Sequence, residues 1–246
     1  MELLSKFLGE ISYPLEDILF AGVTFFLWAA VSLTFAGYTK QRQNYPTGYS
    51  RKIFHFLIFG AASIVQWRWG FPGVCLFGAL TSMVIFYALL RGDGHPWYEA
   101  LAREKDAPYR TRYIILPYLA TLIGGMGSNL LFGQFALIGY LVTGIGDAIA
   151  EPVGVRFGKH AYRVPVFGNL ESIRTVEGSL AVFLGSLGSL LLGTMILGVW
   201  HSTFLHIGAV AGVGVVCAGL EAATPHGWDN TTLQIIPTLL VWWMWG

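Results

Sequence analysis

Residues 146–179 read GDAIAEPVGVRFGKHAYRVPVFGNLESIRTVEGS, and long apolar runs lie directly before and after them. Ionisable groups this dense beside apolar runs are costly in a membrane, because each adds about 2.5–3.5 kcal/mol at the bilayer centre. They are retained where they face protein, water, metal or ligand. Mixed carboxylates and cations suit a nucleotide bound with a divalent metal, since carboxylates hold Mg²⁺ while Lys and Arg neutralise phosphate.

The composition of the whole chain is that of a polytopic membrane protein. Of its 246 residues, 54% are hydrophobic and only 12% are charged, whereas a soluble domain carries roughly 25% charged residues. We therefore predict an all-α membrane bundle forming one domain over residues 1–246. A transmembrane helix needs about 20 apolar residues. The predicted spans are 18–38, 53–67, 71–90, 113–131, 132–150, 179–199, 204–223 and 231–245. The second and last are short, so seven spans is the alternative to eight.

The distribution of basic residues predicts which side of the membrane each loop faces. Thirteen of the 15 Lys and Arg residues fall in alternate loops, and only Lys6 and Arg68 lie on the other side. The positive-inside rule places the basic loops in the cytoplasm. All the polar motifs then share the cytoplasmic face. We expect the inner membrane of a prokaryote, or an organellar or endoplasmic reticulum membrane in a eukaryote.

The segment RKIFH at 51–55 opens the second predicted span. Arg51 and His55 are four residues apart and share a helix face. Anchoring at the cytoplasmic surface would explain Arg51 and Lys52 equally well. It does not explain His55, which lies one turn deeper and could pair with a carboxylate, contact a phosphate or move a proton.

The loop 91–112 contains GDGHPW, in which Pro96 suits the first turn of a short helix. We expect an interfacial helix with Trp97, Tyr98 and Leu101 toward lipid and Arg103 toward water. A lid over the site is the alternative.

Asp147 and Glu151 lie one helical turn apart, and Gly154 and Gly158 continue the same face. Two like charges at this spacing repel each other, and a bound cation would convert the repulsion into a pair of ligands. The glycines allow close approach of backbone to phosphate, or simply tight helix packing. The segment ending in Lys159 lacks the spacing of a Walker A loop.

Two further motifs follow. In RTVEGS at 174–179, Arg174 suits a phosphate and Glu177 a metal, although the Thr and Ser could equally be helix caps. Glu221 precedes HGWDNTT at 226–232, where Asp229 or Asn230 could cap the last helix or take part in chemistry. Cys75 and Cys217 lie inside apolar spans and are interpreted as small buried residues rather than metal ligands or a disulfide.

These pieces together resemble the dolichol kinase and phytol kinase family of membrane lipid-alcohol kinases. The matching segments are RKIFH, GDAIAEPVGVRFGKH, RTVEGS and E…DNTT, in the family's order from about residue 50 to 232. The resemblance implies phosphoryl transfer from a nucleoside triphosphate, usually CTP, to the hydroxyl of a polyprenol, dolichol, phytol or farnesol type alcohol, or of diacylglycerol. The implied cosubstrate is CTP and the implied cofactor is Mg²⁺; the expected partners are the lipid alcohol and the bilayer, and no nucleic acid is expected.

Roles follow from this resemblance. The predicted metal ligands are Asp147, Glu151 and Glu177. The residues assigned to the triphosphate and the transferred phosphate are Arg51, Lys52, Gly154, Arg156, Gly158, Lys159, Arg174 and Asn230. The predicted catalytic residues are His55, Asp147 and Asp229, with Asp229 as base or second metal ligand.

A second enzyme class shares part of this pattern. Phosphatidate cytidylyltransferases carry a similar GD…G…FGKH and KTxEG, but end in a histidine-glycine-glycine and paired-aspartate signature where this chain has HGWDN at 226–230. These enzymes make CDP-diacylglycerol from CTP and release pyrophosphate. The alternative functions for this chain are therefore phosphatidate cytidylyltransferase and diacylglycerol kinase. Arg174 stands where many relatives carry lysine. A transporter is disfavoured because the ionisable residues gather at one face and no inverted repeat is visible. The acceptor's chain length, the preferred nucleotide and the oligomeric state, including a homo-oligomer, stay open.

Overall fold

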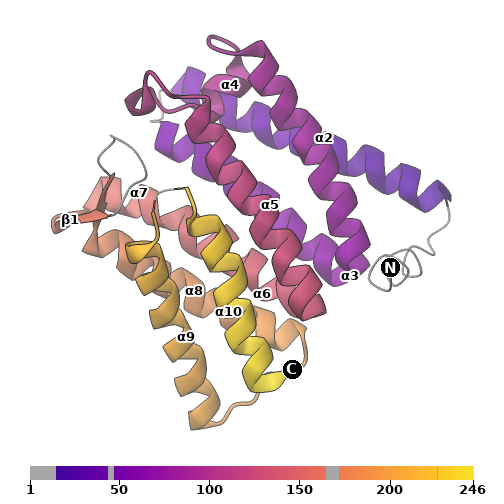
Figure 1. The fold of residues 1–246 in the computed structure, drawn as a ribbon, viewed down its shortest axis with the longest axis vertical. Coiled ribbons are helices and arrows are strands. Elements are labelled where there is room, and N and C mark those ends of the chain that lie inside the picture. The colour runs from indigo at the N-terminus through magenta and orange to yellow at the C-terminus, as the bar shows by residue number, and fades with distance from the viewer. Residues whose placement is uncertain (1–14, 44–46, 165–171, 226) are drawn as a thin grey trace.

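The computed structural model describes residues 15–43, 47–164, 172–225 and 227–246, and almost all of this is helical (Figure 1). The longer helices are α2 (Leu15–Gln43), α3 (Thr47–Arg91), α5 (Arg112–Phe132), α8 (Val176–Ile196), α9 (Phe204–Ala223) and α10 (Asp229–Trp245). Shorter helical segments are α4 (Pro96–Leu101), η1 (Glu104–Asp106), η2 (Gly133–Phe135), α6 (Ala136–Leu141), η3 (Val142–Asp147) and α7 (Ala148–Phe157). The predicted all-α polytopic bundle is confirmed.

Helix α3 is a helical hairpin rather than one rod. Its apolar stretch Gly48–Arg91 has 44 residues, which would measure about 66 Å at 1.5 Å per residue, twice the roughly 30 Å of the bilayer core. The helix breaks at Gly70, whose φ of 60° is readily adopted by glycine. Phe54 and Ile85, from its two halves, then belong to one buried cluster. The predicted spans 53–67 and 71–90 are these two halves.

The apolar stretch Arg112–Phe157, 46 residues long, is divided in the same way. Gly133, with φ of 56°, ends α5, and the chain continues through η2 into α6, η3 and α7. These segments contain the predicted spans 113–131 and 132–150. With α8 and α9 as predicted, the count of seven or eight depends on α10, whose 17 residues lie at the lower limit for a membrane helix.

Large apolar side chains cover the outside of the bundle, as a lipid environment requires. Phe20 is 77% exposed, Leu131 is 65% exposed and Phe204 is 88% exposed. Such a surface would be an aggregation hazard in water, whereas lipid chains solvate it. The chain is therefore an integral membrane protein.

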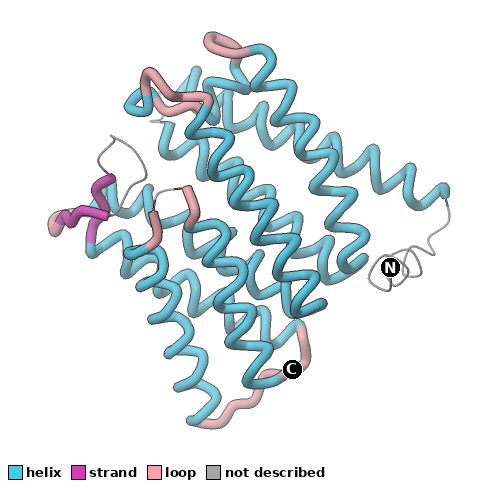
Figure 2. The backbone as a smooth tube through the Cα atoms, in the orientation of Figure 1, coloured by secondary structure: helices cyan, strands magenta, loops and turns pink. Residues whose placement is uncertain are grey.

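A small antiparallel hairpin was not anticipated from the sequence. Strand β1 (Ala161–Val164) pairs with β2 (Ser172–Thr175), with Tyr162 opposite Arg174 (Figure 2). The hairpin lies at the end of the bundle that also carries α4, α7 and the first turn of α10 (Figure 1). It holds Arg174 at the start of α8, where Thr175 caps the helix by accepting a hydrogen bond from the Gly178 N–H.

Candidate active site

Asp147 lies at the centre of a buried charge cluster. It ends the π-helical segment η3, a type of irregularity that is frequent at functional sites. Its carboxylate accepts a hydrogen bond from Lys52 Nζ at 2.6 Å, and His55 Nε2 lies 3.4 Å from the same oxygen. Lys52 and Asp147 are only 8% and 4% exposed. The RKIFH motif at 51–55 and the GDAIAE segment that begins at residue 146 therefore meet through these three side chains.

Glu151, one turn beyond Asp147, faces two guanidinium groups. Arg51 NH2 lies 3.2 Å from one carboxylate oxygen and Arg103 NH1 lies 3.8 Å from the other. Arg103 is also held by Asp106 through two hydrogen bonds of 2.8 and 3.1 Å. The expectation that Arg103 points to water was wrong, because the loop 91–112 folds inward over this cluster. No periodic pattern in the sequence around Arg103 indicated that its side chain would be buried.

Arg174 joins the third and fourth motifs. Its Nε lies 2.9 Å from Glu221, and its NH2 donates to Asp229 at 3.0 Å. The remaining nitrogen, NH1, is buried and has no hydrogen-bond partner among the residues that the structure describes. A buried donor without a partner is unfavourable, so this nitrogen is suited to an incoming anion.

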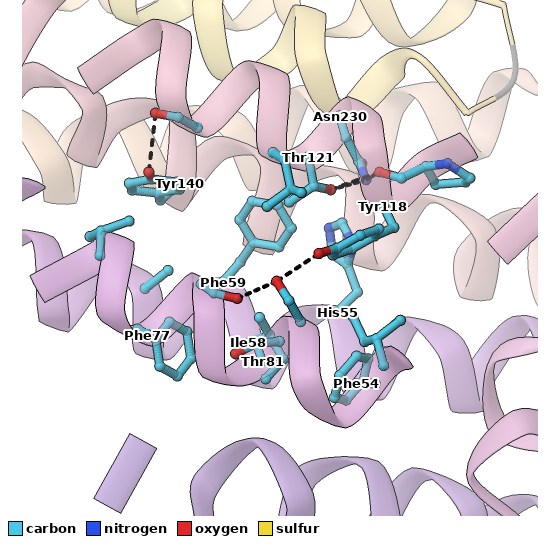
Figure 3. A pocket seen from close by; sticks show the side chains of 18 of the residues that line it. Phe54, His55, Ile58, Phe59, Phe77, Thr81, Tyr118, Thr121, Tyr140 and Asn230 are labelled. Atoms are coloured by element: carbon cyan, nitrogen blue, oxygen red, sulfur yellow. Dashed lines mark hydrogen bonds between the residues drawn. The ribbon is translucent and has the colours of Figure 1, made fainter. Parts of the chain in front are cut away.

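A cavity of about 350 Å³ begins at part of this charge cluster and continues between α3 and α5. Lys52, His55, Asp147 and Asp229 line its charged end. The rest of its wall is mainly apolar and includes aromatic side chains (Figure 3). His55 and Asn230 lie toward one end of the view, and Phe77 and Tyr140 toward the other. The cavity is therefore shaped for an amphiphile with one polar end.

The chain is 31% identical to a phytol kinase of Synechocystis sp. over 226 residues, covering 88% of this chain and 91% of the relative. An identity of this extent, over nearly all of both chains, decides the assignment. The protein belongs to the dolichol and phytol kinase family. No protein-family profile and no solved structure matches the chain. In this family member, all four motifs that carry the resemblance contribute to one end of the bundle.

The two motif glycines, Gly154 and Gly158, serve close helix packing. A Cβ at Gly154 would lie 2.9 Å from Thr175 Oγ1, and one at Gly158 would lie 2.6 Å from Thr175 Cγ2. Real Cβ atoms do not approach neighbours so closely, so both positions require glycine to seat α7 against the start of α8. The sequence left two roles open for these glycines, approach of the backbone to phosphate and tight helix packing. The structure shows tight packing at both positions.

Three other predicted residues lie at the outer edge of this site. Arg156 and Lys159 are exposed at the end of α7. Glu177 bonds to His160 Nδ1 at 2.8 Å rather than to the buried cluster. Within the described ranges, no three acidic, histidine or cysteine side chains converge as a metal-type cluster. Asp147 and Glu151 are each neutralised by basic partners, so their assignment to metal stays a prediction.

The loop over the site is held by Glu99. Burial opposes ionisation of Glu99, but hydrogen bonds from Arg110, the Gly94 N–H and Lys40 outweigh it and lower its pKa to about 2. Arg110 NH2 lies 2.7 Å from the Glu99 carboxylate. Tyr98 and Leu101 were expected to face lipid, and this was wrong, because both are buried in the core beside α2 and α3.

Arg103, which belongs to the same loop, lies beside a second guanidinium group, that of Arg51. Burial and the neighbouring Arg51 lower the pKa of Arg103, although Glu151 and Asp106 counter the effect. The two guanidinium groups share Glu151 between them. Together with the Asp106 contact, these pairs balance the two guanidinium charges with two carboxylates.

Proposed function

We propose that this protein is a CTP-dependent kinase that phosphorylates the hydroxyl of a membrane lipid alcohol of the polyprenol, dolichol, phytol or farnesol type. The observation that carries the proposal is the cavity, whose charged end includes Asp147 and Asp229 and whose body is apolar. A prenyl chain suits the apolar body, and its hydroxyl would lie among the charged groups. Membership of the family supports the same reaction class.

The nucleotide is assigned to the rim of the same site. The exposed Arg156 and Lys159 are accessible from outside the bundle, and NH1 of Arg174 is buried without a hydrogen-bond partner among the described residues. A guanidinium binds phosphate oxygens with directional hydrogen bonds. We therefore assign Arg156 and Lys159 to steering the triphosphate and Arg174 to its terminal phosphate.

Asp147 fits a role in binding Mg²⁺. Mg²⁺ in kinase sites commonly takes one or two protein carboxylates, with phosphates and water completing its shell. Asp147 lies at the charged end of the cavity. Mg²⁺ held there would neutralise charge on the transferring phosphate. Lys52 balances the Asp147 carboxylate before any ligand binds.

The chemical step needs a positioned hydroxyl more than a strong base. The acceptor oxygen forms a bond to the γ-phosphorus, the bond from phosphorus to the bridging oxygen breaks, and CDP leaves. Asp229 is assigned to take the hydroxyl proton. His55 is assigned to orient the hydroxyl, because its Nε2 is fixed by the Thr143 carbonyl at 3.0 Å and by Asp147.

Sidedness follows from the charge distribution. We assign the charged end to the cytoplasm, since most Lys and Arg residues fall in the loops at that end. CTP would then arrive from the cytoplasm and the alcohol from the bilayer.

The test is incubation of purified protein with CTP, ATP or GTP and a panel of lipids: farnesol, phytol, dolichol, diacylglycerol and phosphatidate. We expect CDP to form with CTP and a prenyl alcohol. Pyrophosphate formed with phosphatidate would identify a cytidylyltransferase instead. CDP formed only with diacylglycerol would identify a diacylglycerol kinase. As the matched control, Asp147→Asn should purify as a folded protein without turnover.

A further inference from the structure

The returning half of α3, residues 71–91, lines the cavity with a broad helix face. Phe71, Val74, Gly78, Ser82 and Ile85 follow one another at intervals of three or four residues along the middle of that face, and Cys75, Phe77, Ala79 and Thr81 lie beside them. Residues at this spacing share one face of a helix. Gly78 is at the middle of this face, so a side chain at position 78 would point into the cavity.

Gly78 leaves its part of the cavity wall bare. Apart from its chain neighbours and its own helix backbone, a Cβ built at this position meets no atom of the described residues within 4 Å. This differs from Gly154 and Gly158, where neighbouring atoms leave no room for a side chain. Helix packing therefore does not require glycine at 78, and the free space beside it is space that belongs to the cavity.

A hydrogen-bonded bridge crosses from α5 to α3 beside this bare position. Tyr118 OH donates to Ser82 Oγ at 2.6 Å, and Ser82 Oγ in turn donates to the Gly78 carbonyl. Figure 3 shows Tyr118 reaching across toward α3, near His55. A chain that extends from the charged end into the apolar body thus passes the Tyr118 bridge at the level of Gly78.

We propose that Gly78 is a specificity-determining position, at which one prenyl chain of the acceptor passes the Tyr118–Ser82 bridge and packs against bare helix backbone. This inference rests on the proposed function and adds the location of the acceptor chain. A cavity of about 350 Å³ is at the small end of the roughly 300–1,000 Å³ range of ligand pockets. The bridged passage accordingly selects a single prenyl chain over the two acyl chains of diacylglycerol.

Gly78→Leu tests this proposal, and Gly60→Leu is the matched control. Gly60 is also in α3, and a Cβ built there likewise meets no atom of another described part of the chain within 4 Å, but Gly60 does not line the cavity. With geraniol, farnesol and geranylgeraniol as acceptors, Gly78→Leu should lower kcat/KM at least about tenfold for the longest alcohol and much less for geraniol. The KM for CTP should stay unchanged. Gly60→Leu should keep the wild-type order of acceptors.

Equal loss for all three alcohols, or the same chain-length profile in both variants, would overturn the proposal. A second measurement applies even if Gly78→Leu folds poorly or if no phosphoryl transfer is found. Cys75 lines the same cavity one turn from Gly78, while Cys217 is buried elsewhere. In wild-type protein without CTP, farnesol should slow modification of Cys75 by N-ethylmaleimide, read by mass spectrometry, and leave Cys217 unaffected.

The two measurements separate the two claims. Protection of Cys75 without any turnover would support the acceptor position while refuting the proposed kinase reaction. Turnover on prenyl alcohols without protection of Cys75 would refute the acceptor position while leaving the kinase reaction intact.

Discussion

The buried pair of Lys52 and Asp147 makes the sharpest prediction about what holds the site together. Their atoms are 2.6 Å apart, and their side chains are 9% and 5% exposed. Lys52→Met would leave the Asp147 carboxylate buried without its main partner. Removing one member of a buried ion pair costs about 3–5 kcal/mol. Because His55 stays 3.4 Å away, we expect the lower value.

A loss of about 3 kcal/mol corresponds to a fall of roughly 6–12 °C in the unfolding midpoint of a chain of this size. The assay is thermal unfolding of purified protein in detergent at one fixed heating rate. The double variant Lys52→Met with Asp147→Leu removes both charges and should recover most of the loss, since apolar replacement of both partners is often neutral or stabilising. Lys159→Met, at an exposed position, should leave the midpoint unchanged. A single variant as stable as wild type, or a double variant no more stable than the single one, would refute the reasoning.

Four further outcomes are expected. His55→Ala should lower turnover by about 10²–10⁴-fold, as loss of a positioned proton-transfer or hydrogen-bonding group does, with expression unchanged; wild-type kinetics would reduce His55 to a structural residue. Gly158→Ala should destabilise the protein, because its Cβ would lie 2.2 Å from the Gly154 carbonyl oxygen; an unchanged unfolding midpoint would contradict the packing role. Glu99 has a pKa of about 2 against its usual 4.5, so its stabilisation of the loop 91–112 is complete above pH 4.5 and is lost as the pH falls toward 2; the hydrogen-exchange protection factors of this loop, corrected for the intrinsic exchange rate at each pH, should fall over that interval, and in a Glu99→Gln variant they should change much less. Lys159→Cys should react with an impermeant thiol reagent only from the cytoplasmic side, and labelling from outside intact cells would reverse the assigned topology.

The long apolar runs predicted the helices well, because a membrane span is a strong signal in composition alone. Gly70 and Gly133 could not be distinguished in advance from the other glycines, although both divide long helices where positive φ is needed. The predicted boundary near residue 70 came from the apolar runs and the lone Arg68. The small β-hairpin carried no comparable signal, since its strands have only four residues each.

Charge positions predicted which motifs meet, but not how their side chains pair. Lys52 could have been a surface anchor by its position, yet it bonds to Asp147 inside the bundle. Arg103 lies in a loop, and only the inward fold of α4 brings it beside Glu151. The sequence pattern assigned no role to Glu221, and in the structure its carboxylate forms an ion pair with Arg174. Such pairings depend on how separate helices pack, which no local pattern encodes.

The most direct measurement follows the γ-phosphate of CTP. Purified protein is incubated with CTP radiolabelled in its γ-phosphate, Mg²⁺ and farnesol or phytol, and the lipid fraction is then separated from the nucleotides. We predict that the label moves to the lipid as a prenyl phosphate and that unlabelled CDP accumulates in equal amount, with neither product formed by Asp147→Asn. Label recovered as pyrophosphate, or left in CTP with every prenyl alcohol, would contradict the proposed function.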